Sequence, residues 1–77
     1  MPRIGPVSLR AFEHFLIEMG CVSKRQKGSH KIYHRPGLAR PIVLPIHGKE
    51  LPAPYVRSAL KGLGVSEDEF LRRIGGN

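Results

Sequence analysis

The sequence predicts a small α+β domain with the order α-β-β-β-α, in which helices pack on one face of a three-stranded antiparallel sheet. Two segments towards the ends of the chain repeat apolar residues every three or four positions, which predicts amphipathic helices. Between them, short segments rich in branched apolar residues are separated by turn residues, as is typical of antiparallel strands. A sheet that helices cover on one face leaves its other face free.

The first helix is expected over residues 8–19. Ser8 is a favoured N-cap, because its hydroxyl can accept a hydrogen bond from a backbone N–H that the first turn leaves free. Gly20 follows where a left-handed residue often ends a helix. The apolar face of this helix consists of Leu9, Phe12, Leu16 and Met19.

Three strands are expected in the middle of the chain. Residues 21–27 and 30–34 flank Gly28-Ser29, a two-residue hairpin signal. A looser turn over residues 35–40 leads to the third strand, within residues 41–46. Prolines at both ends of this segment cannot donate to a ladder, so we expect it at an end or edge of the sheet.

The last third of the chain is expected to be helical. Pro54 suits a first helical turn, and Gly64 ends the helix. Ser66 and Glu69 have the spacing of a capping box that opens a short terminal helix. The apolar residues of these two helices are Val56, Ala59, Leu60, Leu63, Phe70, Leu71 and Ile74.

Length and cysteine content indicate one domain. We expect it to span residues 1–77, with a core from about residue 8 to residue 74 and a frayed tail over residues 75–77. The single cysteine, Cys21, excludes an internal disulfide framework, fits a reducing cytoplasm and is expected to be a packing residue. There is no apolar run long enough to span a membrane and no signal-peptide pattern.

Positive charge is concentrated in one part of the chain. The formal net charge is +7, and no acidic residue lies between Glu18 and Glu50. This predicts attraction to RNA, DNA or an acidic protein, although a solvated face remains the alternative. The basic and histidine residues of this window are Lys24, Arg25, Lys27, His30, Lys31, His34, Arg35, Arg40, His47 and Lys49.

His30 is the candidate catalytic residue. Its imidazole titrates near neutral pH and follows the basic hairpin turn, where a phosphate backbone would be attracted. Strand alternation places His30, Ile32 and His34 on one side of the strand and Lys31, Tyr33 and Arg35 on the other. If Ile32 faces the helices, His30 shares that side at the beginning of the strand. The alternative is a structural histidine of the hairpin.

The RNA cleavage that this arrangement would support uses the substrate's own 2′-hydroxyl. His30 would act as base or acid, and Lys24, Lys27 and Lys31 would offset charge that develops on the phosphate. No second catalytic group is evident. The candidate RNA-binding residues are Lys24, Arg25, Lys27, Gly28, Ser29 and Lys31.

Other side chains are expected to have simpler roles. Tyr33 either stacks on a base or packs in the core. His14, His34 and His47 are expected at the surface. No metal or cofactor is expected, because the one cysteine and the scattered histidines lack metal-ligand spacing.

Three segments together resemble the HicA-type toxins, also called the YcfA-like family. They are residues 25–33 around Gly28-Ser29-His30, residues 43–51 with Pro45-Ile46-His47-Gly48-Lys49-Glu50, and residues 57–61. The resemblance runs in order from about Ser8 to Leu71. It implies a fold like a double-stranded-RNA-binding domain, activity as an mRNA interferase, a HicB-type antitoxin partner, and His30 as the catalytic histidine.

The leading interpretation is a metal-independent endoribonuclease that acts on mRNA as the toxin of a type II toxin–antitoxin pair. A non-catalytic RNA-binding module is the first alternative, with His30 as part of the hairpin. The second alternative is an inactive relative whose basic face only holds an acidic protein. Product formation separates the first two, and RNA binding separates both from the third.

Overall fold

The computed structural model describes residues 4–46 and 48–74. Tail residues 75–77 and His47, for which the sequence analysis made predictions, lie outside this part. In chain order, the elements are β1 (Val7–Ser8), α1 (Leu9–Glu18), β2 (Val22–Lys27), β3 (His30–His34), β4 (Ile42–Pro45), β5 (Glu50–Leu51), α2 (Ala53–Leu63) and α3 (Glu67–Ile74).

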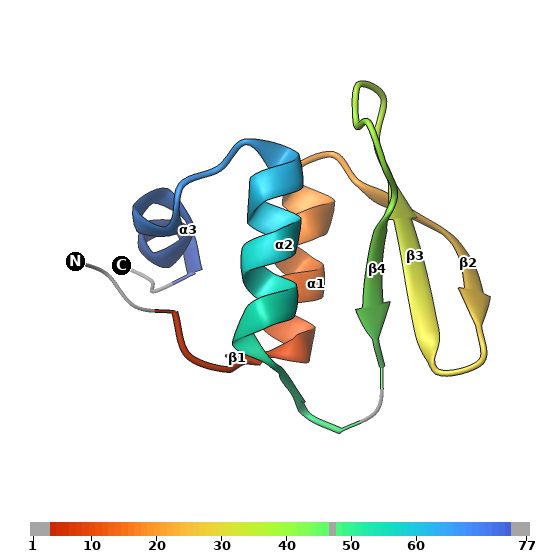
Figure 1. Cartoon of the computed structure of the whole chain (residues 1–77), viewed down its shortest axis with the longest axis horizontal. Coiled ribbons are helices and arrows are strands. Elements are labelled where there is room, and N and C mark those ends of the chain that lie inside the picture. The colour runs from red at the N-terminus through yellow and green to blue at the C-terminus, as the bar shows by residue number, and fades with distance from the viewer. Residues whose placement is uncertain (1–3, 47, 75–77) are drawn as a thin grey trace.

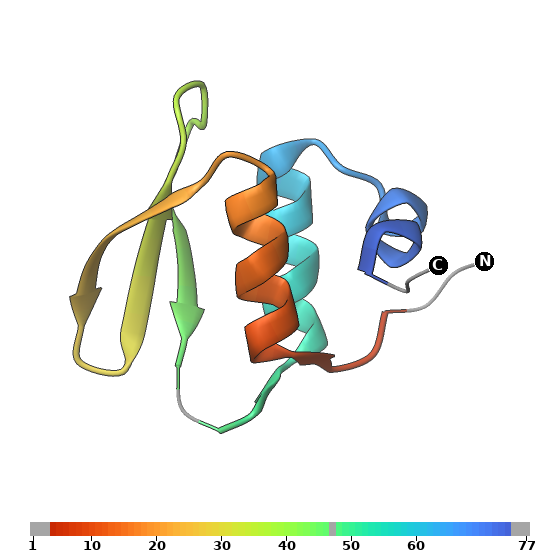
Figure 2. The same ribbon diagram turned by 180° about the vertical axis from the view of Figure 1, so that it is seen from behind.

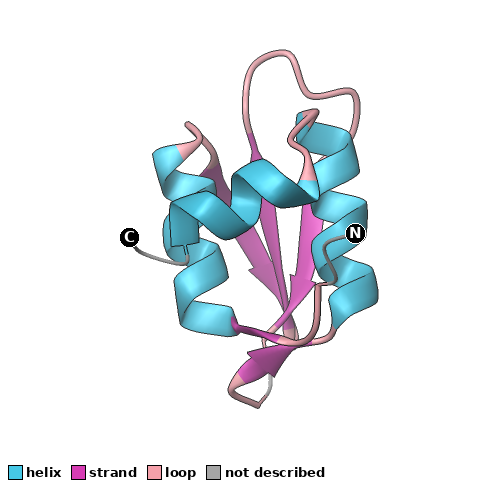
Figure 3. Cartoon of the chain, turned by 90° about the vertical axis from the view of Figure 1, so that its left-hand side faces the viewer, coloured by secondary structure: helices cyan, strands magenta, loops and turns pink. Residues whose placement is uncertain are grey.

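The elements form three layers. Strands β2, β3 and β4 make an antiparallel sheet in that order, and α1 and α2 lie side by side over one of its faces (Figure 1). Seen from behind, the other face of the sheet is free of helices (Figure 2). Helix α3 crosses α1 and α2 on the side away from the sheet (Figure 3). This confirms the predicted α+β class.

Helix α1 begins and ends as its sequence predicts. The Ser8 hydroxyl accepts a hydrogen bond from the Ala11 N–H at 3.2 Å, and Gly20 has a φ of 90° beyond the last turn. The Arg35 guanidinium also donates to the Met19 carbonyl at 2.9 Å. Arg35, one of the basic residues between Glu18 and Glu50, therefore caps the C-terminus of this helix.

The β2–β3 hairpin turns at Gly28-Ser29, as predicted, with Lys27 opposite His30 and a φ of 60° at Gly28. Glycine adopts this left-handed conformation without the cost that a side chain would add. The register shifts between Ser23 and Arg25, so Lys24 is the extra residue of a bulge in β2.

Strand β4 is an edge strand, which confirms the expectation from its prolines. The Ile46 N–H donates to the Ser29 carbonyl at 2.7 Å. Because bonded and non-bonded pairs alternate in an antiparallel ladder, the backbone groups at positions 41, 43 and 45 point away from β3. Pro41 and Pro45 therefore stand where a proline removes no ladder hydrogen bond to β3.

Helices α2 and α3 complete the core. Pro54 lies in the first turn of α2, and Gly64 ends it with a φ of 74°. The Ser66 hydroxyl accepts from the Glu69 N–H at 3.1 Å, which is one half of the predicted capping box. The Glu69 carboxylate instead accepts from Arg73 Nε at 3.3 Å.

Three aromatic rings join α1 to α3. The ring of Phe70 lies 5.5 Å from that of Phe12 and 4.9 Å from that of Phe15, both at steep angles. All three side chains are buried. Edge-to-face packing of this kind adds to the stabilisation that burial itself gives. A short ladder between β1 and β5, with Val7 opposite Leu51, was not predicted.

Candidate nucleic-acid interface

Strand β3 presents Tyr33, and not Ile32, to the helices. The Tyr33 side chain is only 2% exposed, and its hydroxyl donates to Glu13 Oε2 at 3.0 Å. Lys31 Nζ donates to the same oxygen at 3.2 Å. The condition under which His30 would share the helix side is therefore not met: His30 and Ile32 lie on the open face of the sheet.

Tyr33 faces the helices because that orientation buries its ring and gives its hydroxyl a hydrogen-bond partner. The ring buries a large apolar area in the core, and Glu13 satisfies the hydroxyl. Burial raises the pKa of Tyr33 to about 12, and the hydrogen bond to Glu13 adds to this effect. Of the two roles considered for Tyr33, packing is confirmed and base stacking is wrong.

The open face gathers basic side chains around His30. His30 is exposed at the first position of β3, directly opposite Lys27, and Arg25 is opposite Ile32. Directly opposed residues have Cβ atoms about 4.5–5.5 Å apart, so Lys27 and His30 are neighbours. Among the described residues, no carboxylate lies within ion-pair distance of Arg25 or Lys27. An anion on this face would meet positive charge that is not already neutralised.

The other predicted RNA-binding residues do not all lie on the same face of the sheet as His30. Gly28 and Ser29 form the exposed turn beside His30, and Lys24 is exposed at the bulge of β2. Lys31 is separate, because it lies on the helix side and its ammonium is held by Glu13. The structure therefore brings five of the six residues to the open face or its rim, and Lys31 to the opposite face.

Sequence reasoning missed an apolar area on the same open face. Val22 is 54% exposed at the start of β2, where it lies opposite His34, and Val43 is 43% exposed on β4, directly opposite the partly exposed Ile32. Exposed branched apolar residues gathered on one open sheet face are typical of a surface that a partner covers. If Tyr33 had been placed in the core at the outset, the alternation of side chains would have predicted that Ile32 points outwards and contributes to this area.

The remaining histidines do not join His30. His34 lies at the other end of β3, opposite Val22. His14 is exposed on α1, with Nδ1 3.7 Å from Glu18 Oε2. Cys21 is buried in the core, and burial raises the pKa of its thiol while nearby Arg35 opposes that shift. Within residues 4–46 and 48–74, no three potential metal ligands of the His, Cys, Asp or Glu type are grouped together.

The fold and this surface define a small basic domain of the double-stranded-RNA-binding-domain type, with an exposed histidine on its open sheet face. The model of a family described as the HicA toxin of bacterial toxin–antitoxin systems matches residues 9–65. The chain belongs to the HicA toxin family, whose members are toxins paired with an antitoxin.

Two further findings complete the comparison. No curated protein matches the chain closely enough to count as a relative. In the part of the chain that the structure describes, every helix is too short or too polar to cross a membrane.

Proposed function

We propose that this chain is an endoribonuclease that cleaves mRNA, with His30 as its acid–base residue and a HicB-type antitoxin as its inhibitor. The observation that carries the proposal is the pair formed by His30 and Lys27 on the open face. An exposed imidazole at a strand end, with an ammonium group opposite it, can meet a phosphodiester without rearrangement of the core. Membership of the HicA toxin family supports the same assignment.

The reaction is an internal transfer at phosphorus. The 2′-oxygen of one ribose attacks the adjacent phosphorus, a new 2′-O–P bond forms, and the bond to the 5′-oxygen of the next nucleotide breaks. The 2′-hydroxyl proton goes to a base, and the departing 5′-oxygen receives a proton from an acid. His30 performs one of these transfers, for which a positioned side chain typically contributes about 10²–10⁴ in rate.

The basic residues serve binding and charge stabilisation. Lys27 lies closest to His30 along the ladder and offsets negative charge that grows on the phosphate oxygens. Arg25 and Lys24 extend the positive surface along β2 and bind neighbouring phosphates. Lys31 contributes least in this scheme, because Glu13 already neutralises its ammonium group.

The antitoxin is proposed to cover the open face. Its contact would combine burial of Val22, Ile32 and Val43 with acidic groups placed against Arg25 and Lys27. Such a contact excludes RNA from His30, and opposite charge speeds the encounter at low salt. Hydrogen exchange on the complex should show protection over residues 28–34. Protection confined to α3, with RNA still cleaved, would contradict this mode of inhibition.

The cleavage chemistry can be tested with one matched pair of substrates. A labelled single-stranded RNA should be cut to products with 2′,3′-cyclic phosphate and 5′-hydroxyl ends. The same strand with a 2′-deoxyribose at the mapped cleavage position should stay intact at that position, because the attacking oxygen is missing. A metal chelator should leave the rate unchanged. Equal cleavage of both strands would contradict the mechanism, and binding without cleavage would favour the non-catalytic alternative.

A further inference from the structure

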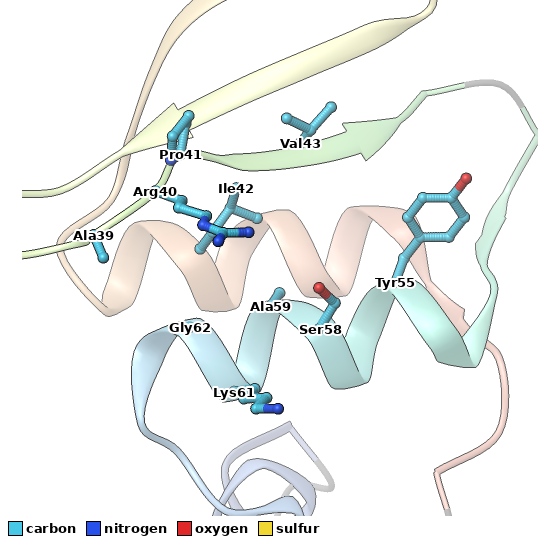
Figure 4. A pocket seen from close by; sticks show the side chains of 10 residues that line it. All are labelled: Ala39, Arg40, Pro41, Ile42, Val43, Tyr55, Ser58, Ala59, Lys61 and Gly62. Atoms are coloured by element: carbon cyan, nitrogen blue, oxygen red, sulfur yellow. The ribbon is translucent and has the colours of Figure 1, made fainter.

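A second surface feature lies beside the open face, between the edge strand β4 and helix α2. It is a cleft of about 520 Å³, within the range of ligand-binding clefts. Ile42 and Ala59 form its apolar floor, and Arg40, Tyr55, Ser58 and Lys61 contribute its polar groups (Figure 4).

The cleft is positively charged. Arg40 and Lys61 are among its lining residues, Arg40 between β4 and α2 and Lys61 on the side of α2 away from β4 (Figure 4), and no acidic residue is among them. Neither cation has a carboxylate within ion-pair distance in the described ranges 4–46 and 48–74. A guanidinium group matches the geometry of a phosphate, and the Ser58 hydroxyl offers a further donor. The charge therefore favours an anionic occupant.

Tyr55 gives the cleft an exposed aromatic surface. Its side chain is 43% exposed, whereas the other tyrosine, Tyr33, is buried in the core. Figure 4 shows the ring of Tyr55 rising from α2 towards β4, on the same side of the helix as Ser58. An exposed ring in a cleft that two cations also line is a combination that binds unpaired nucleotides, since bases stack on the ring and phosphates meet the cations.

The backbone of β4 argues against an extended peptide in this cleft. Of the three outward positions 41, 43 and 45, two are prolines and have no N–H to donate. Only Val43 offers an outward donor, so a strand added at this edge would lack most of its ladder. Recognition here must rely on side chains, which suits a nucleotide better than a β-strand.

The cleft is also close to His30 in the sheet. Pro45 of β4 lies directly opposite His30, and Val43, which borders the cleft, lies directly opposite Ile32. Neighbouring strands are about 4.8 Å apart, so an RNA strand at His30 has to cross only β4 to reach the cleft. We propose that the cleft binds an unpaired nucleotide beside the scissile bond, with its base on Tyr55 and its two flanking phosphates on Arg40 and Lys61, one on each. This inference rests on the proposed ribonuclease function.

The phosphate contacts can be tested by RNA binding in a His30→Ala background, which prevents cleavage during the measurement. The probe is a fluorescent single-stranded RNA decamer, titrated at several salt concentrations. Arg40→Gln with Lys61→Gln should weaken binding and reduce the slope of log affinity against log salt by about 1.4, or about 0.7 for each phosphate that is no longer neutralised. Arg10→Gln with Arg72→Gln is the control, because it removes the same charge from exposed helical positions elsewhere and should leave the slope unchanged.

The stacking contact has its own variant pair. Tyr55→Leu should weaken decamer binding about fivefold or more, since it removes a stacked base. Tyr55→Phe keeps the ring and should bind as the parent does. Neither change should affect binding of a blunt-ended, fully paired RNA duplex, because its bases are already stacked on one another.

Three results would overturn the inference. Unchanged decamer affinity and salt slope in the Arg40 and Lys61 variant would show that the RNA path avoids the cleft. Loss of antitoxin binding by that variant, with RNA binding intact, would make the cleft a protein-binding surface. Failure of the His30→Ala parent to bind any single-stranded RNA would contradict the proposed function itself, and the inference with it.

Discussion

The hydroxyl of Tyr33 donates a hydrogen bond to Glu13 Oε2 at 3.0 Å, which joins the middle strand of the sheet to α1. Lys31, two residues earlier in β3, donates to the same carboxylate oxygen at 3.2 Å. These contacts hold one side of β3 against the helix layer. Because side chains alternate along a strand, these contacts also direct His30 and Ile32 to the open face. A core contact thus determines where the proposed catalytic residue lies.

The first prediction concerns alkaline pH. Burial and the bond to Glu13 raise the pKa of Tyr33 from 10.0 to about 12, because both favour the neutral phenol. The folded-state pKa is the higher one, so the stabilisation is fully present below pH 10 and is lost between about pH 10 and 12. Two pKa units correspond to roughly 2–3 kcal/mol.

This titration can be measured on a single tyrosine. A Tyr55→Phe variant leaves Tyr33 as the only tyrosine of the chain. Its tyrosinate absorbance should rise with a midpoint near pH 12 if the fold persists, and the free energy of unfolding should fall over the two preceding pH units. A midpoint near pH 10 in a protein that is still folded would contradict the Tyr33–Glu13 contact.

The second prediction concerns α3, which lies beyond the residues that the family model matches. Phe70 is fully buried between Phe12 and Phe15, so Phe70→Ala should lower the free energy of unfolding by about 3–5 kcal/mol. Domains of this size have only about 5–15 kcal/mol in total. Urea unfolding followed by circular dichroism measures the change.

The control for this variant is Arg72→Ala, which changes an exposed position of the same helix. It should alter the free energy of unfolding by less than about 0.5 kcal/mol. Similar stability of the Phe70→Ala and Arg72→Ala proteins would show that α3 is not part of the cooperative core.

The helices and the hairpin could be predicted from sequence because their signals are local. Ser8, Gly64 and the Gly28-Ser29 turn act within a few residues of their own position, and each lies where its side chain or φ angle is needed. The edge position of β4 followed from Pro41 and Pro45, which lack the N–H that an inner strand uses on both sides.

The orientation of β3 could not be predicted in the same way. Alternation separates Ile32 from Tyr33 but does not say which of the two faces the helices. The choice depends on Glu13, which is 20 residues away from Tyr33 in the chain and meets it only in the folded protein. The cleft between β4 and α2 depends likewise on how the helix layer sits against the sheet edge.

The third prediction separates the basic residues by face. Arg25→Gln and Lys27→Gln change exposed cations on the open face, so each should weaken RNA binding and reduce the salt slope by about 0.7. Lys31→Gln changes a cation that Glu13 already pairs, so its salt slope should stay close to that of the parent. Fluorescence anisotropy at several salt concentrations measures all three. An equal or larger effect at Lys31 would show that RNA approaches from the helix side.

The central claim is that His30 performs proton transfer in RNA cleavage, and a single-turnover rate tests it most directly. The control is His14→Ala, which removes another exposed histidine, on α1. His30→Ala should retain the circular dichroism spectrum and RNA affinity of the parent while its cleavage rate falls by about 10²–10⁴, and His14→Ala should cleave at the parent rate. Cleavage by folded His30→Ala protein at the parent rate would contradict the account.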